Sequence, residues 1–77
     1  MRNKVPQITN IALKEGTDYI TLQQLLQVGN VLGSGGSAKA YLAQEEVLVN
    51  GEPENRRGRK LHTNDIIETN GKRFRIQ

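Results

Sequence analysis

The sequence predicts an α+β fold in which two short helices pack on one face of a small antiparallel β-sheet with hairpins. Three patterns indicate this fold. Two segments before residue 47 repeat apolar residues at the i, i+3, i+4 spacing of an amphipathic helix. Two Asn-Gly dipeptides in the second half follow short β-branched runs, as hairpin turns do. The last segment alternates apolar with basic residues, which is typical of a half-buried strand.

The N-terminal part is expected to lead into the domain as a strand and a turn. We predict a flexible terminus over residues 1–7 and a single domain over residues 8–77. The apolar and β-branched residues of 8–13 predict the first strand, and the Glu-Gly-Thr-Asp sequence of 15–18 predicts the turn that follows it.

The first helix has clear start and stop signals. Thr21 and Gln24 match a capping box, which satisfies two backbone donors at a helix start. Gly29 and Asn30 predict its end, because both residues tolerate the left-handed cap conformation. Its apolar face is predicted to consist of Leu22, Leu25 and Leu26.

A second helix is predicted over residues 37–46, after the glycine-rich connection of residues 33–37. The i, i+3, i+4 pattern recurs here, so this helix also has a single apolar face. That face is predicted to consist of Ala38, Tyr41 and Leu42.

The remaining residues predict the sheet. Strands are expected over residues 47–49, 65–69 and 72–76, with hairpin turns at the two Asn-Gly pairs that begin at Asn50 and Asn70. Pro53 confines its own strand to a sheet edge or ends it, because proline has no backbone donor. In the last strand the apolar positions are Phe74 and Ile76, and the basic ones are Arg73 and Arg75.

The composition excludes several classes of function. The chain has no cysteine, which removes disulfides, thiolate catalysis and cysteine-based zinc sites. His62 is the only histidine, so neither a metal site nor a catalytic triad is expected. Glu52 and Glu54 flank a proline in a hairpin, and neither this pair nor any other pair of carboxylates suggests acid–base chemistry. We therefore predict a cytoplasmic protein that is no enzyme and has no cofactor, no signal peptide and no membrane span.

The glycine-rich connection resembles two nucleotide-binding motifs and satisfies neither. A helix rather than a strand precedes it, and alanine stands on both sides of Lys39 where a phosphate-binding loop needs glycine and a hydroxyl residue. A contact with a phosphate backbone is still possible there. Gly35 and Gly36 allow close approach, Ser34 and Ser37 offer hydroxyls, and Lys39 offers a charge. The alternative is an ordinary connection between helices with one solvated lysine.

Charge is concentrated in the C-terminal third. Residues 1–52 hold four basic and five acidic side chains, whereas residues 53–77 hold seven basic and three acidic ones. A localised basic block is typical of nucleic-acid binding, and Lys72, Arg73 and Arg75 are expected to continue it onto the last strand. The alternative is a solvated loop. The densest part of the block is Arg56, Arg57, Arg59 and Lys60.

Aromatic residues are scarce, which limits how bases could be recognised. The chain has two tyrosines and one phenylalanine. Tyr41 and Phe74 are in phase with the predicted core, which leaves Tyr19. RNA-binding surfaces that stack bases need several rings. The sequence therefore favours contacts with phosphates, sugar hydroxyls and the shape of structured RNA.

The order of these features resembles the S-four-type RNA-binding domain, which is named after a small-subunit ribosomal protein and recurs in pseudouridine synthases and tyrosyl-tRNA synthetases. From Tyr19 to Ile76 the chain is most similar to the small stand-alone YaaA-type members of that family. The motifs that carry the resemblance are a helix followed by Ser34-Gly35-Gly36, Ala38-Lys39, Leu42, Val47-Leu48-Val49, Asn50-Gly51-Glu52, the basic cluster and Asn64-Asp65-Ile66-Ile67-Glu68.

The resemblance implies a non-catalytic, monomeric module that binds structured RNA, either rRNA or tRNA, at the ribosome. It implies one phosphate contact at Ser34, Gly35, Gly36 and Lys39, and another at Asn50, Arg56, Arg57, Arg59 and Lys60. Many members of the family have arginine where this chain has the two glycines, and glycine where it has Glu45. Two other functions stay open: an adaptor whose basic loop docks on an acidic protein, and a DNA-associated accessory protein of replication.

Overall fold

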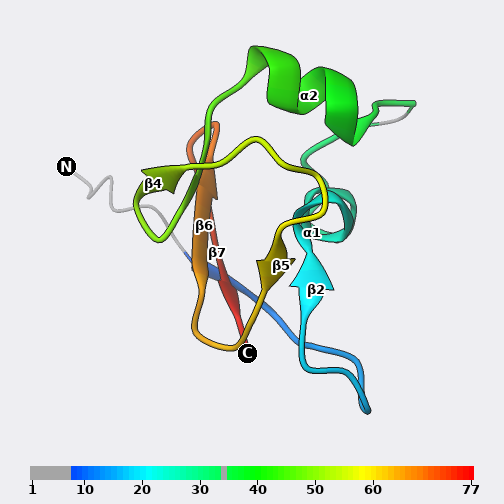
Figure 1. The fold of residues 1–77 in the computed structure, drawn as a ribbon, viewed down its shortest axis with the longest axis vertical. Helices are drawn as coiled ribbons and strands as arrows, with labels where there is room; N and C mark the ends of the chain where they lie inside the picture. The colour runs from blue at the N-terminus through cyan, green and yellow to red at the C-terminus, as the bar shows by residue number, and fades with distance from the viewer. Residues whose placement is uncertain (1–7, 34) are drawn as a thin grey trace, which may run out of the picture.

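The computed structural model describes residues 8–33 and 35–77. A five-stranded sheet has the order β1-β7-β6-β3-β4. A separate two-stranded sheet pairs β2 with β5, which lie side by side in Figure 1. The predicted flexible terminus, residues 1–7, lies outside the described residues. In chain order the elements are β1 (Ile8–Ile11), β2 (Ile20–Thr21), α1 (Leu22–Val28), α2 (Ala38–Gln44), β3 (Val47–Val49), β4 (Glu52–Pro53), β5 (Lys60–Leu61), β6 (Ile66–Thr69) and β7 (Lys72–Ile76).

The α+β class is confirmed, with one correction to the sheet. The five-stranded sheet is mixed, because β1 runs parallel to β7, with Ile8 opposite Arg73 and Ile11 opposite Ile76. The other pairs in this sheet are antiparallel, as predicted. Both helices and five strands separate β1 from β7 along the chain. No hairpin joins the two strands, so no turn signal could reveal their relative direction.

The start and end of α1 follow the sequence signals. The Thr21 hydroxyl accepts from the Gln24 amide at 3.2 Å, and the Gln24 side chain accepts from the Thr21 amide at 3.0 Å. Asn30 takes the left-handed conformation after the helix, with φ of 60°. Gly29 is required for packing, because a Cβ there would lie 2.8 Å from the Phe74 ring.

The second helix is shorter than predicted. It spans Ala38–Gln44, and Glu45 already has extended backbone angles (φ −115°, ψ 145°). The Glu46 carbonyl accepts from the Thr69 hydroxyl at 2.9 Å, and that hydroxyl in turn lies 2.6 Å from the Tyr41 hydroxyl. The prediction that the helix reaches residue 46 is therefore wrong, because β6 holds this carbonyl in an extended segment.

Both Asn-Gly turns are confirmed. Asn50 and Gly51 have φ of 52° and 86°, and Asn70 and Gly71 have 51° and 77°. Positive φ at both central residues is the geometry that matches the twist of a tight hairpin. The strand that contains Pro53 lies at the edge of the sheet, as predicted.

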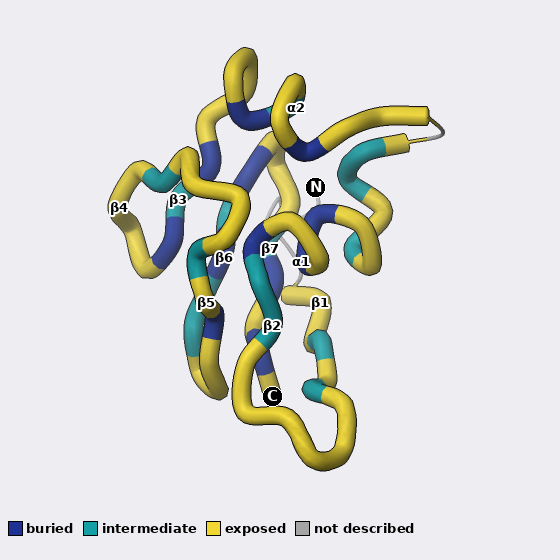
Figure 2. The backbone as a smooth tube through the Cα atoms, turned by 45° about the vertical axis from the view of Figure 1, so that its right-hand side comes forward, coloured by how far each residue is buried: buried dark blue, intermediate teal, exposed yellow. Residues whose placement is uncertain are grey.

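One hydrophobic core joins both helices to one face of the large sheet. Figure 2 shows the buried segments gathered inside the molecule and the connecting loops exposed. The predicted apolar faces are confirmed, with Tyr41 half-buried at the margin. The core residues are Leu22, Leu25, Leu26, Ala38, Leu42, Val47, Val49, Leu61, Ile67, Phe74 and Ile76.

The small sheet was not predicted. Its strands β2 and β5 have two residues each, and the sequence predicts only a basic loop where β5 lies. Ile20 pairs with Leu61, and Thr21 pairs with Lys60. Two residues are too few to show an alternating pattern, so only the tertiary structure reveals this pairing. The pairing fixes the end of the basic loop next to the start of α1.

Candidate nucleic-acid interface

The basic loop, defined here as residues 56–60, is attached to the start of α1. The Leu22 amide donates to the Arg59 carbonyl at 2.8 Å, and the Gln23 amide donates to the Arg57 carbonyl at 3.0 Å. A helix start normally leaves such donors without a partner. Here the loop supplies the partners, so the loop and the helix hold each other in place.

A largely covered carboxylate organises the arginines of this loop. The side chain of Glu54 is only 7% exposed. It accepts from Arg56 Nε at 2.9 Å and from Arg59 Nη1 at 2.7 Å. The hydrogen bond from Arg56, with a further contribution from Arg59, lowers the pKa of Glu54 to about 2 despite the opposing effect of burial. Sequence reasoning missed this role, because a glutamate beside a proline carries no signal of partners.

The loop still presents positive charge to the outside. Arg56 keeps 71% of its side chain exposed although it pairs with Glu54. Within residues 8–33 and 35–77, neither Arg57 nor Lys60 forms an ion pair. An open hollow of about 540 Å³ is lined by Arg56, Gly58, Arg59 and Lys60. The structure therefore brings three of the four predicted loop cations around one hollow.

Arg73 and Arg75 of β7 do not continue this surface. Arg73 and Arg75 project from the sheet face opposite the core, whereas the basic loop is bonded to α1, which packs on the core face. Arg73 Nη2 lies 2.8 Å from Glu68 Oε2, and Arg75 Nη2 donates to Asn64 Oδ1 at 3.1 Å. The expectation that Arg73 and Arg75 continue the basic stripe is wrong, because alternation along β7 points these two side chains to the face opposite the core. Lys72 lies on the same face as Phe74, and its ammonium group donates to the Asn30 carbonyl at 3.5 Å.

The glycine-rich connection forms a second loop. Gly35 has φ of +77°, and a Cβ at Gly36 would lie 2.3 Å from the Leu32 carbonyl oxygen. An arginine at position 36 would therefore clash with the backbone. Ser34 lies outside the described residues.

The start of α2 contributes one capping group and one exposed charge. The Ser37 hydroxyl accepts from the Ala40 amide at 3.1 Å, so it caps the helix. Lys39, in the first turn, is exposed. Ser37 thus has a structural use, and Lys39 supplies the charge of this loop.

Asn50 lies on a third loop, the β3–β4 turn. Its side-chain oxygen accepts from the Ile66 amide at 2.9 Å, and its side-chain nitrogen donates to Asp65 at 3.1 Å. These bonds tie the turn to the start of β6, although the residue remains exposed. The described residues predicted to bind RNA therefore lie on three separate loops.

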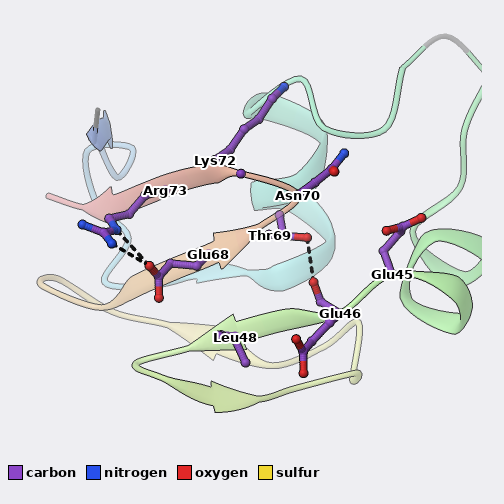
Figure 3. Close-up of a pocket in the computed structure, with 9 residues that line it drawn as sticks. Glu45, Glu46, Leu48, Glu68, Thr69, Asn70, Lys72 and Arg73 are labelled. Carbon is purple, nitrogen blue, oxygen red and sulfur yellow. Dashed lines mark hydrogen bonds and ion pairs between the residues drawn. The ribbon is translucent and has the colours of Figure 1, made fainter. Parts of the chain in front are cut away.

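A different hollow, of about 350 Å³, lies beside the β6–β7 hairpin (Figure 3). Glu68 and Arg73 pair with each other there, and the Thr69 hydroxyl donates to the Glu46 carbonyl. Glu68, Thr69 and Arg73 are thus engaged in contacts within the protein.

Two searches of the described residues gave negative results. Over residues 8–33 and 35–77, no group of three or more histidine, aspartate or glutamate side chains is placed to hold a metal ion. No helix in this part of the chain has the length and apolar character needed to cross a membrane.

Comparison with known proteins assigns the family. Residues 12–77 match the S4 domain. A relative described as "Probable ribosome maturation protein RlbA", from Bacillus subtilis (strain 168), is 54% identical over 55 residues, which cover 71% of this chain and 78% of that protein. No solved structure matches significantly. The chain thus carries the RNA-binding domain that its motif order predicted, and it belongs to the S4 domain family.

Proposed function

We propose that this protein is a non-catalytic module that binds structured ribosomal RNA during ribosome maturation, through phosphates and helical shape. The observation that carries the proposal is the basic loop, which hydrogen bonds anchor to α1 and to Glu54 while Arg56, Arg57 and Lys60 stay exposed. Membership of the S4 domain family and the ribosome maturation relative favour RNA as the ligand.

The attachments of the loop favour tight binding. A loop that is ordered before binding loses less conformational entropy when its ligand arrives. Glu54 holds two arginines, and the start of α1 holds two carbonyls of the same loop. Arginine suits this task because its planar group can donate two parallel hydrogen bonds to phosphate oxygens.

The other two loops would add weaker contacts. Gly35 and Gly36 have no side chain to keep a sugar–phosphate backbone at a distance, and Lys39 is exposed nearby. Ser34 and Ser37 belong to the same proposed contact. Asn50 would contact RNA through the part of its amide that Asp65 and Ile66 do not use.

The test is a titration with duplex-bearing fragments of ribosomal RNA at two salt concentrations. Each neutralised phosphate releases counterions, so affinity should fall steeply as salt rises. Replacing both Arg57 and Lys60 by alanine should weaken binding about tenfold or more. It should also lower the steepness of the plot of log affinity against log salt concentration by about two. Lys14→Ala is the single-charge control, because Lys14 is exposed on a different loop.

Binding that does not respond to salt, or a double variant that binds as Lys14→Ala does, would contradict the proposal. Competition with transfer RNA and with DNA of equal length identifies the nucleic acid. Ribosome copurification that survives nuclease treatment would instead indicate a protein adaptor.

A further inference from the structure

The small β2–β5 sheet places four side chains on one outward face. Ile20 and Leu61 are paired in this sheet, and both pack toward the core. Because side chains alternate along a strand, their neighbours point the opposite way. Continuing the register by one residue sets Tyr19 opposite His62, beside the pair formed by Thr21 and Lys60.

Contacts among these side chains form a small aromatic cluster. The rings of Tyr19 and His62 have centroids 6.2 Å apart and are tilted by 55°. The ammonium group of Lys60 lies 4.9 Å from the centre of the Tyr19 ring. Tyr19 is 40% exposed, whereas Phe74 is buried and the Tyr41 hydroxyl contacts Thr69 inside the protein. Tyr19 is therefore the aromatic side chain most accessible to a ligand.

Lys60 links this cluster to the basic loop. The same side chain lies against the Tyr19 ring and lines the hollow with Arg56, Gly58 and Arg59. A phosphate in the hollow and a base on the ring would therefore belong to the same or adjacent nucleotides. Within a duplex, neighbouring bases cover both faces of each base, so a protein ring can stack only on an unpaired one.

We propose that Tyr19, supported by His62, stacks one unpaired base beside the RNA helix whose phosphates bind the basic loop. This inference rests on the proposed function and names the feature of RNA that the site recognises. The ligand is a duplex with a bulged or flipped nucleotide. Lys60 exchanges its contact with the ring for the phosphate, which opens the ring face to the base. A single ring is enough for one nucleotide, although the composition is too poor for a surface that stacks several.

The binding test compares a duplex carrying a one-nucleotide bulge with the same duplex fully paired. The unchanged protein should prefer the bulged RNA, and Tyr19→Ala should lower that preference about tenfold, because stacking on an aromatic side chain has about this effect. Tyr19→Phe, which keeps the ring, should retain the preference. Val28→Ala is the matched control, because it removes another exposed apolar side chain, on α1.

A second measurement observes the ring directly. The chain has two tyrosines, so ring resonances labelled with carbon-13 report on Tyr19 and Tyr41 separately. The bulged RNA should shift the Tyr19 signals upfield and leave those of Tyr41 in place. An RNA with an abasic bulge should produce no such shift.

The outcomes separate this inference from the proposed function. If both RNAs bind in a salt-dependent manner but Tyr19→Ala keeps the full preference, or no preference exists, the stacking site is refuted and RNA binding stands. If neither RNA binds, both proposals fail.

Discussion

The basic loop and the glycine-rich connection before α2 are both irregular segments with a predicted phosphate contact, yet they are held in different ways. The basic loop depends on residues distant in the chain, since its carbonyls bind the start of α1. The connection depends on its own backbone, where the Gly36 amide donates to the Gly33 carbonyl at 3.3 Å and Gly36 lies against Leu32. Local residues fix the second loop, and tertiary contacts fix the first.

The largest difference in stability between the two loops should appear when one glycine in each loop is replaced by alanine. Gly36→Ala should lower the free energy of unfolding by about 2 kcal/mol, because the new Cβ would meet the Leu32 carbonyl oxygen at 2.3 Å. Gly58→Ala, in the basic loop, should have almost no effect, because nothing lies within 4 Å of its Cβ position. Urea unfolding of both variants measures this, and equal values would contradict the account of the connection.

A smaller effect should follow from loosening the basic loop. Glu54→Gln should lower the free energy of unfolding by roughly 1 kcal/mol, because the neutral amide cannot accept from both arginines as the carboxylate does. Glu52→Gln is the matched control at an exposed position two residues earlier, with no change expected. Equal stability of the two variants would show that Glu54 does not organise the loop.

The smallest effect concerns pH. The pKa of Glu54 is lowered from 4.5 to about 2 in the folded protein. A lowered carboxyl pKa stabilises the fold above pH 4.5, and this contribution is lost as pH falls toward 2. The stability gap between the unchanged protein and Glu54→Gln should therefore narrow from pH 6 to pH 3, as measured by urea unfolding at each pH. A gap that widens on acidification would contradict the assigned cause.

The contrast between local and tertiary contacts also explains how much of the structure could be predicted from the sequence. The capping box at Thr21 and the turns at Asn50 and Asn70 were predicted correctly, because the residues that define them are adjacent or three apart. The steric need for Gly36 is local too, but it appears only when the backbone is built.

The features that sequence reasoning missed depend on pairs far apart in the chain. The parallel pairing of β1 with β7 and the two-residue pairing of β2 with β5 have no local signal. In the candidate site, the cations of the basic loop were identified from composition. Their anchor, Glu54, was not, because burial of its side chain arises only in the folded protein. Nor could composition show that Arg73 pairs with Glu68 on the other face of the sheet.

Mapping the RNA contact by amide chemical shifts is the most direct test of the central claim, that a preformed basic loop is the main contact. Titration of the labelled protein with a ribosomal RNA duplex should perturb residues 56–60 most and the connection around Gly35 and Lys39 less. It should leave the outward face of β7, at Arg73 and Arg75, nearly unchanged. Shifts concentrated on that face of β7, with the basic loop unaffected, would contradict the account.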